Sequence, residues 1–387
     1  MTNLTLNNTQ IQAALNDLVS KPSGLNAMLE MTLNAFMKAE RNVHLLNNDN
    51  NKANGYRRVN GLGLGEALQL NIPRDRLSQF KPWILEVMRE SQDQMNELFF
   101  ELYAKGLTTR DIESLTESVY GQRLSRSSIS RITEAFGEEM TEFRGRPLDK
   151  HYPIIYLDAT FISTRREQVS KEAYYIALAV RPDATRDVIG IYNAPTESAS
   201  IWHDIIGDLK SRGLETSHLF ITDNLQGLDT AIEQHFEDVD IQKCVVHLKR
   251  HTLNRVKKTH RQAVADDLKE VFDLGKNDDT LADAMVRAKR FHDRWIPHYS
   301  HVKLFNNEQQ MHYYFSYLNY HSAIRNMIYT TNWIERLNKD FKRVIKMRNA
   351  MPSVNSALTL LSKVALDKNL SRYQYPVHRL KADFMFQ

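Results

Sequence analysis

The chain contains 387 residues, of which 42% are apolar and 25% are charged. These fractions are typical of soluble globular proteins and exclude collagen-like, mucin-like and wholly disordered chains; at about 150 residues per domain, the length predicts two to three domains. The 51 Lys and Arg residues barely outnumber the 47 Asp and Glu residues, for a net charge of +4, so binding to nucleic acid would require the basic residues to be clustered.

Cys244 is the single cysteine of the chain. One cysteine forms neither an intrachain disulfide nor a four-cysteine zinc site, and it favours a reducing compartment. The N-terminal stretch MTNLTLNNTQIQAALNDL has neither a basic start nor a long apolar core, so we expect no signal peptide. We also expect no membrane span, because no stretch approaches about 18 uninterrupted apolar residues.

The first 82 residues predict two segments. Residues 1–50 carry apolar residues at helical spacing and end in a polar stretch that is typical of a loop. Residues 51–82 predict a β-hairpin, because EALQLNI alternates apolar and polar residues and the glycines before it permit a turn. Gly61, Gly63 and Gly65 do not have the spacing of a dinucleotide-binding loop, and no strand–helix–strand pattern surrounds them. Hairpin glycines are therefore the better interpretation.

Residues 83–150 are helical in pattern and contain the spacing of a helix-turn-helix. Thr108 or Thr109 can cap the helix DIESLTESVY, Gly121 permits a turn, and Ser125 can cap a second helix, SRSSISRITEAF. An ordinary pair of antiparallel helices would give the same pattern, so this segment alone leaves both interpretations open. In the DNA-binding interpretation, the side chains that would meet DNA are Arg123, Arg126, Ser127, Ser128 and Arg131.

Residues 151–246 predict a mixed α/β sheet. The expected elements are strands at 151–163, 173–180 and 187–192, a helix at 199–213, a strand at 218–223, a helix at 228–236 and a strand at 240–246. Three consecutive strands followed by alternating helices and strands predict an antiparallel meander that continues through parallel crossovers. This is the element order of the ribonuclease H-like fold. Residues 247–325 and 326–387 are helical in pattern.

Three carboxylates are candidates for metal-dependent phosphoryl transfer, which needs oxygen ligands that converge on one point. Asp158 lies within the apolar strand IIYLDATF, where an unpaired carboxylate is costly, and alternation places it on one face with Tyr156 and Thr160. Asp223 follows the fourth strand, which lies beside the first in this topology, so it can reach Asp158. Glu335 stands at the start of a basic helix. A loop cap for Asp223 and a salt-bridged helix face for Glu335 remain open as alternatives.

Two runs of basic residues are candidates for DNA contact. Residues 241–264 contain seven Lys and Arg residues and no acid, and like charges crowded on a helix favour a polyanion partner over a solvated face. Residues 336–348 contain six basic residues and one acid, Asp340. The candidate contacts in and beside these runs are His247, Lys249, Arg250, Asn332, Arg336, Lys339, Lys342 and Arg343.

Cys244, His247 and His251 superficially resemble a zinc site. They provide three potential ligands with no evident fourth, and Cys244 is expected on a strand. A buried cysteine and a DNA-facing histidine are therefore the preferred interpretation.

Several motifs together resemble the Mutator-type transposases of bacterial insertion sequences over nearly the full chain. The motifs are YLDA (156–159), WHDIIGDLKSRG (202–213), TDNLQG (222–227), CVVH (244–247) and TTNWIERLN (330–338), with GYRRVNG and IPRDR (72–76) upstream. The family's catalytic acids correspond to Asp158, Asp223 and Glu335, and its Cys-x-x-His signature falls on Cys244 and His247. The chain departs from the family's common pattern at Asn224, Gln226 and Trp333, which puts substrate-end specificity in doubt rather than the chemistry.

The resemblance implies a DDE transposase with a ribonuclease H-like catalytic domain at 151–246, an all-α insertion at 247–325 and completing helices at 326–387. It implies two Mg²⁺ or Mn²⁺ ions held by Asp158, Asp223 and Glu335. The expected partners are double-stranded DNA, both the terminal inverted repeats and the target, and further copies of the chain in a homodimer or larger assembly. The expected location is the bacterial cytoplasm, on the nucleoid when DNA is bound.

Two other functions remain open at this point. One is a catalytically inactive relative that acts as a DNA-binding repressor, which the presence of all three acids disfavours. The other is a cellular ribonuclease H-like nuclease, which would cut RNA–DNA hybrids or branched DNA without joining ends.

Overall fold

The computed structural model describes residues 24–48, 50–62, 67–120, 125–194, 199–274, 279–346 and 348–380. The chain divides into two compact units, Met1–Ala135 and Phe136–Gln387. The predicted helical pattern before residue 24 and the candidate DNA contact Arg123 lie outside the described residues.

The first unit begins with a helix packed on a hairpin. Helix α2 (Gly24–Leu46) lies against strands β1 (Ala53–Leu62) and β2 (Ala67–Asp75), which pair antiparallel where the sequence predicts a hairpin. Asp75 fixes the end of the hairpin, since Asn51 and the backbone N–H groups of Gln79 and Phe80 donate to its carboxylate. Burial opposes ionisation of Asp75, but these hydrogen bonds outweigh it and lower its pKa to about 2. The apolar core is Met37, Leu68, Leu70 and Ile72.

Three helices follow: α3 (Trp83–Ala104), α4 (Thr109–Tyr120) and α5 (Arg126–Gly145), the last of which spans the division between the units. Thr108 caps α4 by exchanging hydrogen bonds with Asp111, and the Ser125 hydroxyl accepts from Ser128 N at the start of α5, as the sequence predicts. Arg126 forms an ion pair with Glu113 of α4 at 2.7 Å. This pair links the two helices of the predicted helix-turn-helix.

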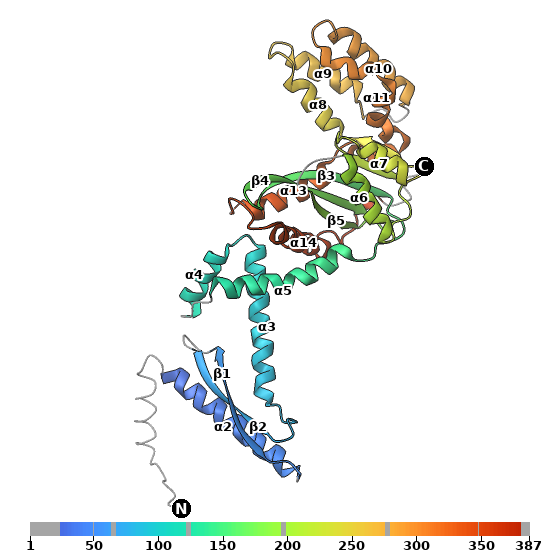
Figure 1. The fold of residues 1–387 in the computed structure, drawn as a ribbon. Coiled ribbons are helices and arrows are strands. Elements are labelled where there is room, and N and C mark those ends of the chain that lie inside the picture. Colours follow the sequence, from blue (N-terminus) through green and yellow to red (C-terminus); the bar gives the residue numbers. More distant parts are fainter. Residues whose placement is uncertain are drawn as a thin grey trace, which may run out of the picture. The chain divides into compact units, whose positions relative to one another are not determined.

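The second unit contains a five-stranded mixed sheet, drawn in Figure 1. Its strands are β3 (Ile154–Arg165), β4 (Val169–Val180), β5 (Arg186–Ala194), β6 (Leu219–Thr222) and β7 (Asp240–Lys243), in the order β5-β4-β3-β6-β7. The pairs β3–β4 and β4–β5 are antiparallel, whereas β3–β6 and β6–β7 are parallel. The predicted meander followed by parallel strands is confirmed.

Helices cover both faces of this sheet (Figure 1). Because strand side chains alternate, Ile155 and Leu157 of β3 point into an apolar core with α6 (Ala199–Ser211) and α7 (Leu228–His235). The opposite face of β3 carries Tyr156 and Asp158, and it is covered by α13 (Asn332–Ile345) and α14 (Val354–Leu370). Asp158 therefore faces the helices that complete the chain.

An all-α segment separates the last strand from α13. It comprises α8 (Val245–Asn254), α9 (Arg261–Val271), α10 (Leu281–Trp295), η1 (Ser300–Asn306), α11 (Glu308–Phe315), η2 (Ser316–Asn319) and α12 (Ser322–Ile328). Buried Gln242 of β7 joins this segment to the sheet, since its side chain donates to Tyr314 O and accepts from Tyr317 N. None of the described helices is long and apolar enough to cross a membrane.

The prediction of a strand at 240–246 is wrong in its second half. Strand β7 ends at Lys243, and Cys244 is the N-cap of α8. The two valines after Cys244 favour a strand by local propensity, but Cys244 N bonds to Thr222 O and Val245 N bonds to Tyr329 O. These long-range hydrogen bonds turn the chain away from the sheet.

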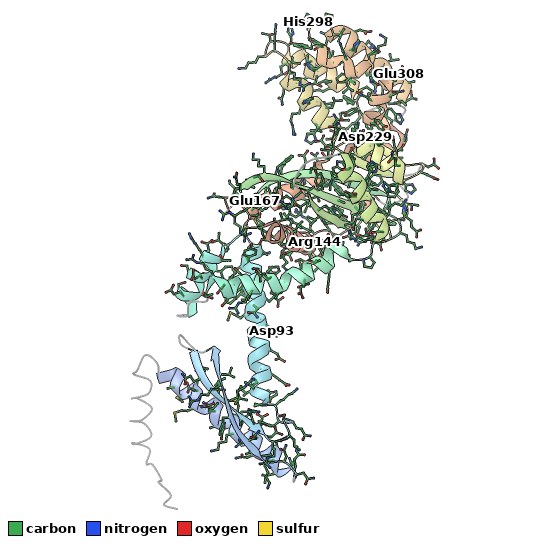
Figure 2. The ribbon with its side chains drawn as sticks, viewed as in Figure 1. Asp93, Arg144, Glu167, Asp229, His298 and Glu308 are labelled. Atoms are coloured by element: carbon green, nitrogen blue, oxygen red, sulfur yellow. The ribbon has the colours of Figure 1, made fainter. Side chains whose placement is uncertain are left out.

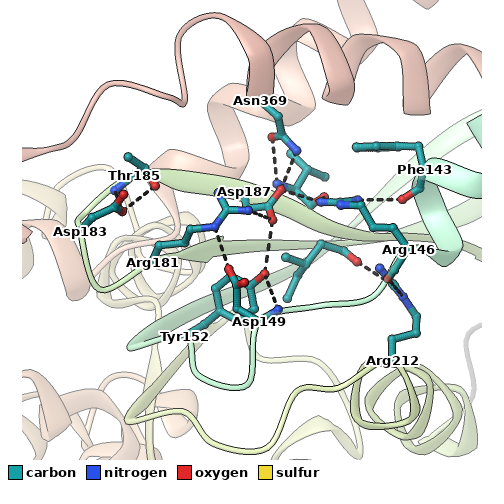
Figure 3. A network of polar contacts seen from close by, with 12 residues as sticks. Phe143, Arg146, Asp149, Tyr152, Arg181, Asp183, Thr185, Asp187, Arg212 and Asn369 are labelled. Carbon is teal, nitrogen blue, oxygen red and sulfur yellow. Dashed lines mark hydrogen bonds and ion pairs between the residues drawn. The ribbon is translucent and has the colours of Figure 1, made fainter.

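A buried carboxylate joins the residue after α5 to the sheet and to α14 in the second unit (Figure 3). Asp187, which is 2% exposed, accepts hydrogen bonds from Arg146 at 2.6 Å, from Arg181 at 2.5 Å and from Asn369 at 2.6 Å. A second link between α5 and α14 is the hydrogen bond from Arg144, labelled in Figure 2, to Ser362 at 3.0 Å. Removing the Asp187 charge would leave Arg146 without a carboxylate partner and Arg181 with only the exposed Asp149.

We predict that Asp187→Asn destabilises the protein by about 3 kcal/mol, because breaking a buried ion pair from one side leaves charge uncompensated. The measurement is thermal unfolding of the full chain, with a Tm fall of about 5–10 °C. Asp149→Asn is the matched control, because Asp149 also pairs with Arg181 but its side chain is 57% exposed. Equal Tm values for the two variants would contradict the prediction.

Candidate active site

Asp158 lies in the middle of β3 with its carboxylate only 8% exposed. One oxygen accepts from Ala159 N at 2.8 Å, and the other accepts from Asn338 Nδ2 at 2.7 Å. Burial, with a smaller contribution from the charges of Asp223 and Glu335, raises the pKa of Asp158 to about 7, against the backbone hydrogen bond from Ala159 and the charge of His247. A neighbouring cation would stabilise the charged form of this buried carboxylate.

Strand register brings Asp223 to Asp158. Leu157 of β3 pairs in parallel with Thr222 of β6, so the next residues, Asp158 and Asp223, follow at the same level of the sheet. Asp223 is the first residue after β6, where a parallel strand ends and its side chain is free of the ladder. Two acids that are distant in the sequence thus lie side by side at the carboxyl end of β6.

Helix α13 delivers the third acid. Glu335 lies in its first turn and Asn338 follows three residues later, so both side chains project from one face of the helix. Glu335 accepts from the Thr331 hydroxyl at 3.4 Å, while Asn338 reaches Asp158. Sequence reasoning missed Asn338; its i, i+3 spacing from Glu335 is the signal that could have found it.

His247 of α8 stands between two of the acids. Its Nδ1 lies 3.0 Å from Asp223 Oδ2, and its Nε2 lies 3.3 Å from Glu335 Oε1. Contact with Asp223 and with the Cys244 sulfur raises the pKa of His247 to about 10, against the effect of burial. The imidazolium therefore supplies positive charge inside the acid cluster, where the sequence suggests only a DNA-facing histidine.

Cys244 fixes the starts of α8 and α13 against each other. Its buried sulfur accepts from Thr331 N at 3.4 Å and lies 3.8 Å from the Thr330 hydroxyl. Burial would raise the pKa of this thiol, but hydrogen bonds from His247 and Thr331 outweigh burial and lower it. Cys244 thus positions the turn from which Glu335 projects, and His247 lies one helical turn further on.

The donor set suits a divalent cation by its chemistry. Three carboxylates offer the oxygen ligands that Mg²⁺ and Mn²⁺ prefer, and a cation would offset the charges that raise the pKa of Asp158. Within the described part of the chain, however, no group of three or more His, Cys, Asp and Glu side chains is arranged to hold a metal ion. In this arrangement His247 stands between Asp223 and Glu335.

The basic side chains predicted to contact DNA are distributed over both units. In the first unit Arg126, Ser127 and Arg131 are exposed, Ser128 is half-buried, and Arg126 is paired with Glu113. In the second unit Lys249 packs over the Phe272 ring. The exposed candidates there are Arg250, Asn332, Arg336, Lys339, Lys342 and Arg343.

A cavity of about 560 Å³ opens beside the acids within the second unit. Asp223, His247 and His251 line it, and Arg250 of α8 and Arg255, the residue after α8, contribute positive charge. Among the described residues, neither Arg250 nor Arg255 forms an ion pair with an acid. The cavity therefore offers unneutralised cations next to Asp223.

Comparison with known proteins gives a consistent result. The sequence model of the family "Transposase, Mutator family" matches residues 1–374. The transposase for insertion sequence element IS905 of Lactococcus lactis is 32% identical over 359 residues, which cover 92% of this chain and 89% of the relative. The corresponding values for the IS1201 transposase of Lactobacillus helveticus are 31%, 92% and 95%. The IS256 transposase of transposon Tn4001 from Staphylococcus aureus is 28% identical over 94% of each chain.

We predict that Asp158→Asn stabilises the metal-free protein by about 1–3 kcal/mol at pH 8, because the substitution removes a buried charge that two other acids repel. The Asn338 carbonyl oxygen, buried without a partner, is available to a neutral amide at position 158. Since the raised pKa means that folding favours the protonated acid, the wild type should lose stability as pH rises from about 4 to 7.

The measurement is thermal unfolding in a chelating buffer at pH 5 and pH 8. The difference between variant and wild type should be larger at pH 8. Asp204→Asn, an exposed acid on α6, is the control and should leave the Tm unchanged. A lower Tm for Asp158→Asn at pH 8 would show that the carboxylate stabilises the fold.

Proposed function

The chain belongs to the Mutator family of transposases, and we propose that Asp158, Asp223 and Glu335 are the acids with which this transposase cleaves and joins DNA. The observation that carries the proposal is their convergence around His247 from three separate elements. Clustered carboxylates repel one another and so cost stability, and clusters of this kind are typical of functional sites. The order and directions of the strands, which are those expected for a ribonuclease H-like catalytic domain, support the same assignment.

The three acids would hold two Mg²⁺ or Mn²⁺ ions. When bound, such ions activate an attacking oxygen and stabilise the leaving oxygen of a phosphodiester. Neighbouring residues orient the acids: Asn338 donates to Asp158 Oδ2, and the Thr331 hydroxyl donates to Glu335 Oε1. His247 keeps Asp223 and Glu335 from repelling each other before the ions arrive.

Positive charge beside the acids would hold the DNA backbone. The exposed side of α13 carries Arg336, Lys339, Lys342 and Arg343, and Arg250 lines the cavity at Asp223. Phosphate contacts of this kind fix the position of a strand without reading its sequence. The N-terminal unit, with the capped helices α4 and α5, is the part that we assign to the terminal inverted repeats.

The reaction also predicts an assembly. Two element ends must be held together for transposition, and one active site does not serve both ends at once. We therefore propose that at least two copies of the chain assemble on the paired ends, with the bacterial nucleoid as the place of action.

We predict that Asp158→Asn, Asp223→Asn and Glu335→Gln each reduce strand cleavage and joining by about 1,000-fold, since each removes an oxygen ligand from the proposed ion site. The assay follows a labelled duplex that carries the element's terminal repeat, with Mg²⁺, and measures duplex binding in parallel. Binding should persist in all three variants. Asp204→Asn is the matched control, and a wild-type cleavage rate in any of the three would remove that acid from the assignment.

We also predict that Lys339→Ala, Lys342→Ala and Arg343→Ala weaken binding to all DNA sequences alike. Each should reduce the slope of log affinity against log salt concentration by about 0.9, because each lost phosphate contact retains one condensed counterion. The measurement is a salt titration of duplex binding without metal. Lys269→Ala serves as the control, because Lys269 pairs with Asp266 on the surface of α9; an unchanged slope in all three α13 variants would contradict the assignment of this helix to DNA.

A further inference from the structure

A second cavity lies within the second unit, on the side of α13 that does not carry Glu335. Its volume is about 480 Å³, and its walls come from β5, α13 and the segment after α14. The residues that matter for its chemistry are Arg186, Trp333, Arg336, Arg372 and Tyr373.

Arg186 is held between two aromatic rings. Its guanidinium carbon lies 4.9 Å from the centre of the Trp333 ring and 4.5 Å from that of Tyr373. The Trp333 ring also stacks on Tyr156 of β3, with ring centres 6.0 Å apart and an angle of 17° between the planes. The stack fixes the cation in place, which saves the conformational entropy that a free arginine loses when it binds a ligand.

The polar atoms of Arg186 are only partly satisfied. Nη2 donates to the backbone carbonyl of Arg372 at 3.3 Å, and Nε is buried without a hydrogen-bond partner. Burial, together with the nearby charges of Arg372 and Arg336, lowers the pKa of Arg186. Such a cation costs free energy unless an anion joins it.

The acid of the cavity does not supply that anion. Asp340 pairs with Lys368 at 2.5 Å, so the two charges cancel within the wall. Arg186, Arg336 and Arg372 remain without a carboxylate among the described residues. Three guanidinium groups around one cavity match the charge and the hydrogen-bonding capacity of a phosphate group.

We propose that this cavity binds a backbone phosphate of the DNA strand that runs along α13, so that the strand is anchored at a point separate from the three acids. The inference rests on the proposed function, since it assumes that α13 faces DNA. Arg336 follows Glu335 directly, so one helix would present an acid to the reacting phosphodiester and a cation to another phosphate. A stacked nucleobase fits less well, because Trp333 is already in contact with both Arg186 and Tyr156.

The test uses the full chain without divalent metal, so that cleavage plays no part. Arg372→Ala removes an exposed side chain but keeps the backbone carbonyl to which Arg186 donates. Arg186→Met removes the cation and keeps an apolar side chain between the two rings. Arg290→Ala, an exposed arginine of α10 outside the cavity, is the control. Binding to the terminal-repeat duplex is titrated with salt, and duplexes with one neutral methylphosphonate at each position are then compared.

Both cavity variants should lower the salt slope by about 0.9, whereas the control should not. One methylphosphonate position should weaken binding of the wild type and have no further effect in Arg372→Ala. A wild-type slope in Arg372→Ala, or the absence of any coupled position, would overturn the proposal.

Inorganic phosphate provides the second arm. If phosphate raises the Tm of the wild type but not of Arg372→Ala while DNA binding is unaffected by the substitution, the site is for a free anion and the DNA occupant is wrong. Failure of the wild type to bind the duplex at all would overturn both this proposal and the proposed function. If the three acids are not catalytic, in contrast, only the cleavage assay would show it, and the proposed phosphate site would be unaffected.

Discussion

The second unit depends on one electrostatic constraint: three carboxylates must be held together inside a folded chain. In water such groups separate freely, but the fold keeps Asp158 buried near Asp223 and Glu335, and the pKa of Asp158 rises to about 7 as a result. Two side chains lower the cost. His247 bridges Asp223 and Glu335, and Asn338 donates to Asp158. The three carboxylates therefore repel one another in a way that a divalent cation would relieve, as the proposed phosphoryl transfer requires.

The path of the chain follows from this constraint. Parallel pairing of β3 and β6 brings Asp223 level with Asp158, but no strand brings Glu335, which follows Asp223 by 112 residues. The all-α segment spans that distance and returns the chain to the sheet, where Tyr329 O and Thr331 N bond to the start of α8 at Val245 and Cys244. The two ends of the all-α segment are thus hydrogen-bonded to each other beside the acids. This tie explains why a cysteine and a histidine three residues apart belong to the site.

Sequence patterns predict the parts of this arrangement that depend on local chemistry. A carboxylate within an apolar strand marks Asp158, and the end of a strand marks Asp223, because burial and strand ends leave a direct trace in the sequence. The position of His247 and the contact from Asn338 depend on how distant elements meet, and no local pattern reports that. The prediction of a strand at 240–246 is wrong for the same reason, since the backbone N–H groups of Cys244 and Val245, where α8 begins, donate to the distant carbonyls of Thr222 and Tyr329. Local propensity has no access to partners that lie 22 and 84 residues away.

The small net charge of the chain conceals two groups of cations, one that forms internal ion pairs and one that does not. One group is neutralised internally, as Arg146 and Arg181 are by Asp187, and as Lys243 is by Asp229; these cations hold helices and strands together. The other group, along α13 and around Arg186, forms no ion pair with an acid among the described residues, since Asp340 pairs with Lys368, and so remains available to a polyanion. Summation over the whole chain mixes the two groups and yields +4. Their separation in space, rather than their number, is what would let a nearly neutral protein attract DNA, because the field at a surface is set by the charges that lie near it and are left unpaired.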